Sequence, residues 1–185
     1  MGMRTEGRRA LRTELRALML GDVAVPRSMP VRDWELIPAT LIAVRIGRAF
    51  RGGGLPAALP LLPQIDGHPQ TDRRSQTYRV RALRAQVSEA AVFCARDAAW
   101  RLLGLVRTVA GRQLCLHESL SACAGLRRLG FPAEVVIGYP VIEVADGGEE
   151  LHAWPVLGDS PLTGRPGERP LGYVELTRYP EESPW

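Results

Sequence analysis

The sequence predicts an α+β fold in which helices come first and a small antiparallel sheet follows. Helical periodicity, interrupted by glycines and prolines, dominates the first two thirds of the chain. After Pro132 the pattern changes to short β-rich runs, "AEVVIGY", "LHAWPVL" and "GYVELTRY", separated by turn residues. Segregation of helices and strands along a chain is typical of the α+β class.

Two helices are expected in the first fifty residues. Residues 8–20 are amphipathic, with leucines recurring on one face. Residues 33–50 form the second helix, for which Asp33 is a candidate N-cap. Proline is tolerated only near the first turn of a helix, so the position of Pro38 suggests that this helix begins later than Asp33. The run "RGGGLPAALPLLPQ" then breaks the periodicity with three glycines and three prolines.

Two further helices lead to the sheet. Residues 79–109 carry an apolar stripe at a spacing of about 3.6 residues, formed by Val92, Ala95, Ala99, Leu102 and Val106. After the breaker Gly111, residues 115–129 form the next helix, and Gly130 suits the position after its C-cap. We expect an N-terminal helical extension over 1–30, a helical segment with a Pro/Gly-rich loop over 31–78, and the functional core over 79–185.

Composition narrows the class of protein. The 185 residues are 45% hydrophobic and 24% charged, which is ordinary globular composition. All 24 basic residues are arginines; residues 1–107 carry 18 of them against 9 acids, and residues 108–185 carry 6 against 11. The arginines are scattered and the aromatics few, which argues against nucleic-acid binding. No apolar run approaches the length of a membrane span or a signal peptide, so we expect a cytoplasmic protein.

One of the three cysteines lies at a predicted helix start. Cys94, Cys115 and Cys123 show no C-x-x-C spacing, so neither a disulfide framework nor a metal site is predicted, and no cofactor is expected. Cys115 follows a glycine break at a helix N-terminus, where free N–H groups and the helix dipole favour thiolate. His152, on a strand 37 residues later, is the candidate base. Chemistry alone leaves open that Cys115 is a small buried hydrophobe, and it favours that interpretation for the other two.

Other residues have simpler interpretations. His117 lies two positions after Cys115 and is predicted to be a surface histidine, and His68 lies in a polar loop. Trp154 is expected to pack over the site. The first-turn residues Glu118 and Ser119 are predicted to cap the helix and to offset its dipole.

The segment "CLHESLSACAGLRRLGFPAEVVIGYPV" followed by "LHAWPVLGDSPL" resembles the transglutaminase-like cysteine peptidases that remove the leader from lasso peptide precursors, the B2 proteins. The shared motifs are a Cys-Leu-x-x-Ser-Leu helix start at 115–120, an Arg-Arg-x-Gly-x-Pro-Ala helix end at 127–133, Val-Ile-Gly at 136–138 and His-Ala-Trp at 152–154. The match is specific over about 50 residues and weaker over most of residues 35–178. It implies a transglutaminase-like, papain-like core.

The resemblance also implies catalytic roles. Cys115 would attack a peptide carbonyl, His152 would hold the thiolate and protonate the leaving amine, and an acid would orient the imidazole. The family places that acid twelve residues after the histidine, where this chain has Gly164. Asp159 is therefore the expected orienting residue, with Glu168 or no carboxylate as alternatives.

A second departure from the family concerns the strand itself. Pro155 stands where the family has valine, and proline has no N–H to donate, so the strand should lie at a sheet edge or a bulge.

Three functions remain open at this level. The first is a cysteine peptidase that removes the leader of a precursor peptide, working with a separate leader-recognition protein and, in the same pathway, a cyclase. The second is an acyltransferase in which an amine resolves the acyl-enzyme and forms an amide. The third is a scaffold with a degraded site, and the partner of the free nitrogen of His152 distinguishes it from the other two.

Overall fold

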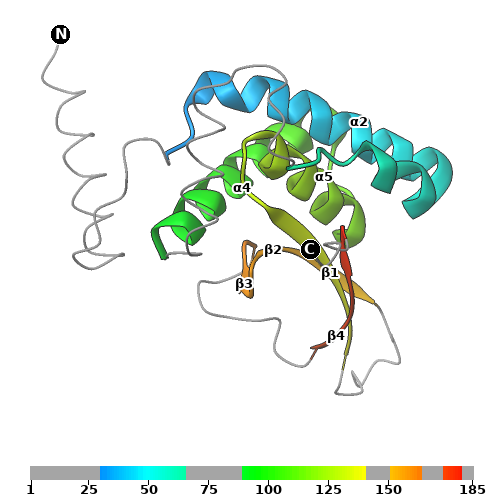
Figure 1. Ribbon diagram of the computed structural model, residues 1–185. Helices are drawn as coiled ribbons and strands as arrows, with labels where there is room; N and C mark the ends of the chain where they lie inside the picture. The colour runs from blue at the N-terminus through cyan, green and yellow to red at the C-terminus, as the bar shows by residue number, and fades with distance from the viewer. Residues whose placement is uncertain (1–29, 66–88, 141–150, 164–172, 181–185) are drawn as a thin grey trace, which may run out of the picture.

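The computed structural model describes residues 30–65, 89–140, 151–163 and 173–180 (Figure 1). Its elements in chain order are α2 (Asp33–Ala58), the 3₁₀-helix η1 (Leu59–Leu61), α4 (Glu89–Ala110), α5 (Cys115–Arg128), β1 (Ala133–Pro140), β2 (His152–Leu157), β3 (Ser160–Pro161) and β4 (Tyr173–Tyr179). The helices gather on one side of the sheet, where α5 contacts the strands and α2 packs on α5 (Figure 1). The predicted α+β class is confirmed; the expected helix 8–20 lies outside the described residues.

Helix α2 differs from its prediction at both ends. Its first helical residue is Asp33 and its N-cap is Arg32, so the assignment of Asp33 as N-cap was wrong. The carboxylate of Glu35 accepts a hydrogen bond of 2.7 Å from the backbone N–H of Arg32, which satisfies a donor at the helix start. The helix continues to Ala58 across a kink, where Gly54 has a φ of 66°. Glycine adopts that conformation without the steric cost of a Cβ.

The predicted stripe of α4 forms the contact with the rest of the core. Ala95, Ala99 and Leu102 are fully buried, Val106 is nearly so, and Val92 is partly buried. Leu102 packs directly on Gly125 of α5, because a Cβ built at Gly125 would lie 2.2 Å from its Cδ2 atom. The absence of a side chain at residue 125 therefore sets how closely the two helices approach.

This close approach yields a stability prediction. Gly125→Ala should destabilise the protein, because overpacking costs about 1–3 kcal/mol and the gain in helix propensity recovers at most about 1 kcal/mol. Gly104→Ala in α4 is the matched control, since nothing lies within 4 Å of the added methyl group. It should stabilise by roughly 0.5–1 kcal/mol. Urea unfolding midpoints compare the two, and equal midpoints would contradict the packing described.

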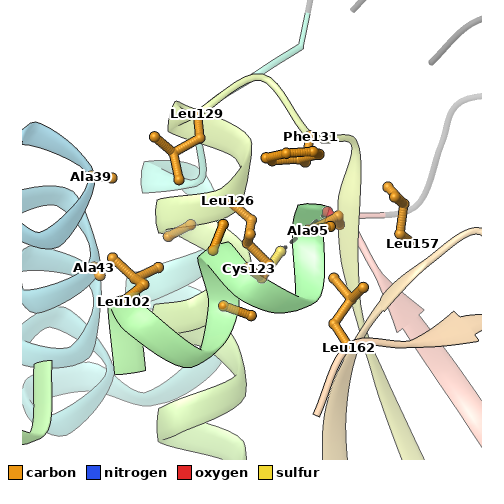
Figure 2. Close-up of a cluster of buried hydrophobic side chains, with 14 of the residues drawn as sticks. Ala39, Ala43, Ala95, Leu102, Cys123, Leu126, Leu129, Phe131, Leu157 and Leu162 are labelled. Atoms are coloured by element: carbon orange, nitrogen blue, oxygen red, sulfur yellow. Dashed lines mark hydrogen bonds between the residues drawn. The ribbon is translucent and has the colours of Figure 1, made fainter. Parts of the chain in front are cut away.

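The end of α5 confirms the prediction for Gly130. This residue has a φ of 91°, and its N–H donates to the carbonyl of Arg127 at 2.9 Å. The N–H of Phe131 donates to Leu126 at 3.0 Å. These two bonds form a Schellman motif, which satisfies free carbonyls at the helix end. Phe131 and Leu126 are both fully buried in the same cluster (Figure 2), so the chain turns into β1 inside the core.

The sheet has the order β3-β2-β1-β4, and its pairs are antiparallel. Strand β1 pairs with β2 from Ala133 opposite Leu157 to Gly138 opposite His152. One face belongs to the main core with the helices and includes Val135, Ile137, Ala153 and Leu157. The other face carries a smaller cluster of Val136, Trp154 and Val156 with Tyr173 packed on it. Alternation along β2 places His152 on the face with Trp154.

Pro155 was expected at a sheet edge or a bulge. It lies on the second strand of the sheet, at the point where the short β3, which pairs with Val156 and Leu157, ends and leaves the outer side of β2 open. The carbonyl of Pro155 accepts a hydrogen bond of 2.8 Å from Leu162, on the side of β2 away from β1. A residue in an antiparallel strand directs its N–H and C=O to the same side. The missing N–H of Pro155 therefore does not interrupt the long β1–β2 ladder.

Candidate active site

Cys115 differs from the other two cysteines in being accessible. It is the first residue of α5, is partly exposed, and follows the N-cap Leu114. Cys94 and Cys123 are buried, as predicted. Burial raises the pKa of Cys123 to about 12, and its thiol lies 3.2 Å from the carbonyl of Ala133. A thiol in such surroundings is inert, so Cys115 is the one cysteine in a position to act on a substrate.

The start of α5 is fixed by an ion pair to the preceding helix. Glu118 accepts two hydrogen bonds from Arg107 at the end of α4, of 2.9 and 2.5 Å. These bonds lower the pKa of Glu118, and the backbone N–H of Gln113 adds a longer contact at 3.4 Å. Gly111, with a φ of 76°, ends α4 and begins the short connection. Glu118 thus holds α4, the connection and the first turn of α5 together, beyond the capping role predicted for it.

Two side chains of α5 bind the strand on either side of His152. The sulfur of Cys115 lies 3.8 Å from the carbonyl oxygen of Leu151, and the hydroxyl of Ser119 donates to the carbonyl of Ala153 at 2.9 Å. Cys115 and Ser119 are one helical turn apart, which places them on the same side of α5. The structure therefore brings the Cys115 thiol to the backbone beside His152, whereas the imidazole itself faces Trp154 and Tyr173 on the other side of the sheet.

These carbonyls lie along the outer edge of β2. The carbonyls of residues 151, 153 and 155 point to the same side of the strand, since they alternate with the others. β3 reaches only as far as Pro155, which accepts the hydrogen bond from Leu162. The side chains of Cys115 and Ser119 therefore occupy the part of the β2 edge that β3 leaves open. Sequence reasoning missed this role of Ser119, although its spacing of four from Cys115 was a signal.

The imidazole of His152 packs against two aromatic rings. Its centroid lies 6.0 Å from that of Trp154, with the planes 25° apart, and 5.4 Å from that of Tyr173. Gly138 makes room for this arrangement, because a Cβ there would lie 2.6 Å from the Cη2 atom of Trp154. Burial lowers the pKa of His152, which favours the neutral ring that accepts a proton. Tyr173 gave no sequence signal, since it comes from a separate strand, β4.

Asp159 does not lie beside His152. It occupies the turn after β2, its carboxylate is well exposed, and it lies 3.7 Å from a guanidinium nitrogen of Arg178. His152 pairs with Gly138 at the opposite end of the strand. Five residue steps separate His152 from the end of β2, which is about 16 Å at roughly 3.3 Å per residue. This placement does not suit the orienting role predicted for Asp159. Gly164 and Glu168 lie outside the described residues.

His117 is a buried residue, so its prediction as a surface histidine was wrong. It is 5% exposed, and its ring meets Phe50 edge-on with centroids 5.6 Å apart. Gly47 of α2 leaves room for the imidazole, because a Cβ at residue 47 would lie 2.4 Å from Nε2 of His117. Burial, together with the charge of Arg51, lowers the pKa of His117. The histidine faces α2 rather than solvent because α2 covers this side of α5.

This burial predicts a pH-dependent stability. The folded-state pKa of His117 is below its unfolded value of about 6.5, so on acidification the unfolded chain binds a proton before the folded chain does. The contribution of His117 to the free energy of unfolding should be constant above that pH and should fall as the pH drops below it. His117→Gln should show a smaller loss of Tm between pH 7.5 and pH 5.5 than the wild type, in the same buffers. An equal loss in both proteins would contradict the assignment.

A scan against protein-family models matches residues 57–176, more than half of the chain, to the transglutaminase-like superfamily. Searches of curated proteins and of solved structures found no match. Within the described ranges, no group of three or more His, Cys, Asp or Glu side chains is placed to hold a metal ion, and no helix is long and apolar enough to cross a membrane. The superfamily generally comprises cysteine-dependent enzymes, and by this match the chain belongs to the transglutaminase-like superfamily.

Proposed function

We propose that this protein is a cysteine peptidase that removes the leader from a ribosomally synthesised precursor, as in lasso peptide maturation. The observation that carries the proposal is the position of Cys115. Its accessible thiol stands at the N-terminus of α5 and 3.8 Å from the carbonyl of Leu151, directly before His152. Helix N-termini stabilise thiolates, and a neighbouring imidazole takes up the proton.

The proposed reaction has two stages. In the first stage the imidazole of His152 turns around the exposed end of β2 and takes the proton of Cys115, and the thiolate attacks the carbonyl carbon of the scissile peptide bond. The oxyanion that forms is bound by free backbone N–H groups at the start of α5, among them that of Cys115. The C–N bond then breaks, and the imidazolium protonates the leaving amine. A water molecule, deprotonated by His152, hydrolyses the thioester and releases the leader acid.

The proposal requires the imidazole to be held without Asp159. The stacked ring of Trp154 and the tilted ring of Tyr173 limit the plane in which the imidazole of His152 can lie. We therefore infer a Cys-His dyad that works without a carboxylate, in which aromatic packing holds the imidazole in its resting position. Asp159→Asn should leave the rate within about threefold of wild type, because its exposed carboxylate lies at the far end of β2.

The exposure of the thiol favours hydrolysis over amide formation. Cys115 is partly exposed, and Leu114 and Leu151 beside it are also open to solvent. A thioester at this position is accessible to water, whereas an acyltransferase must exclude water from the acyl-enzyme. Peptide cleavage is accordingly proposed ahead of amine transfer and ahead of a scaffold role.

The test combines the protein with a precursor peptide, with and without a separate leader-recognition protein. We expect the partner to raise the cleavage rate at least tenfold, and high salt to weaken the effect if the arginine-rich part of residues 1–107 takes part in docking. Masses of free leader and free core peptide support hydrolysis. A condensed amide product would assign the acyltransferase function instead, and no turnover with the partner present would favour the scaffold.

A further inference from the structure

The sheet continues past the start of α5 with exposed apolar side chains on its helix-covered face. Ile137 and Ala153 belong to the face that packs on the helices. Two residues further along each strand, alternation returns Tyr139 and Leu151 to that same face. Both are exposed, and Leu151 is 54% exposed. The helix-covered face of the sheet thus extends beyond α5, where none of the described helices lies over it.

The same row continues onto β4, and the connection before α5 adjoins it where Cys115 meets Leu151. Val174 pairs with Tyr139 and is 54% exposed. Leu114, the N-cap of α5, is 81% exposed and directly precedes Cys115. We name the four residues Leu114, Tyr139, Leu151 and Val174 the apolar shelf. Large apolar side chains from four separate segments rarely gather on a surface without a binding role.

The reactive sulfur stands at the edge of this shelf. Its distance to the carbonyl oxygen of Leu151 is 3.8 Å, and Leu114 is its chain neighbour. An acyl group bonded to this sulfur therefore has the shelf within reach of its first side chain. Cys94 and Cys123 are buried, so Cys115 is the accessible cysteine. The thiol that adjoins the shelf is therefore the one proposed to act in catalysis.

We propose that the apolar shelf binds the acyl side of a peptide substrate, and that it selects a large apolar side chain there. This inference rests on the proposed function, since it takes Cys115 as the nucleophile. The shelf continues the sheet face that α5 covers, so the peptide completes an apolar layer already present. Leu151 is the principal contact because its own carbonyl adjoins the sulfur.

The test uses irreversible probes that need only the thiol. Acetyl-Ala-Leu and acetyl-Ala-Ala chloromethyl ketones are compared by their second-order rates at Cys115, each divided by the rate of iodoacetamide. We expect the Leu probe to react about tenfold faster than the Ala probe, because the shelf covers part of the added apolar surface.

Two variants test whether Leu151 causes the preference for the Leu probe. In Leu151→Ser the ratio of the two probes should fall below about threefold. Leu41→Ser is the matched control, since Leu41 is 68% exposed on α2, and it should keep the wild-type ratio. An unchanged ratio in Leu151→Ser, or no preference in the wild type, would overturn the proposal. Sedimentation that shows dimers which Leu151→Ser abolishes would assign the shelf to a second copy, and would also overturn it.

The two proposals fail in different ways. If no precursor is cleaved but the probe ratio depends on Leu151, the peptidase proposal is wrong and the apolar shelf stands. If precursor is cleaved through Cys115 but the ratio is flat, the shelf is wrong and the peptidase stands.

Discussion

Cys115→Ala is expected to reduce turnover by at least about a thousandfold, since a covalent mechanism loses its nucleophile. The fold should survive, because the sulfur makes one contact of 3.8 Å and lies at a partly exposed position. The measurement is the cleavage rate of precursor in the presence of its recognition protein, with the melting temperature recorded for each variant.

The matched controls are the other two cysteines. Cys94→Ala and Cys123→Ala should keep most of the activity, because both thiols are buried away from substrate. Cys123→Ala removes the contact to Ala133 and leaves a small cavity, so a modest loss of stability is expected. Activity near wild type in Cys115→Ala would refute the peptidase proposal.

Arg178→Met is expected to have the largest effect on stability, about 2–3 kcal/mol. Arg178 donates to Glu134 of β1 at 2.9 Å, to both oxygens of Glu175, and to the carbonyl of Gly158 at 3.0 Å. It therefore ties β4 to β1 and to the turn after β2. The Glu134 side chain is only 11% exposed, so its charge would lose this cation in a poorly solvated place. These bonds raise the pKa of Arg178 above its usual range, and the hydrogen bond to Glu175 contributes most to this shift.

The control for this prediction is Asp159→Asn. The Asp159 carboxylate is 84% exposed and 3.7 Å from the same guanidinium, so it should contribute less than about 0.5 kcal/mol. Guanidinium chloride unfolding of the three proteins gives the comparison. Equal free energies of unfolding for Arg178→Met and the wild type would show that the arginine is not a structural centre of the sheet.

The sequence predicted the local features that depend on neighbours along the chain. The change from helical to β patterning after Pro132 gave the fold class, and the break at Gly111 gave the start of α5. Gly130 was predicted correctly because a left-handed helix end needs glycine whatever packs around it. The burial of Cys94 and Cys123 followed from ordinary cysteine chemistry.

Features that depend on contacts between distant segments were not predicted. His117 looked exposed because nothing in its own helix shows that Gly47 of α2 packs against it. Asp159 is near His152 in sequence, yet an extended strand separates them. Tyr173 reaches the imidazole through the pairing of β4 with β1, which no local pattern announces.

The most direct test of the central claim, that Cys115 accepts an acyl group, is a burst experiment with an activated ester. An excess of acetyl-leucyl p-nitrophenyl ester is mixed rapidly with the protein, and the release of p-nitrophenol is followed over time. The reaction is then quenched with acid, and the protein is digested and mapped by mass spectrometry. We predict a rapid burst of about one p-nitrophenol per protein chain, with the acyl group on Cys115 as a thioester, and no burst in Cys115→Ala. A burst that persists in Cys115→Ala, or an acyl group found on another residue, would contradict the claim.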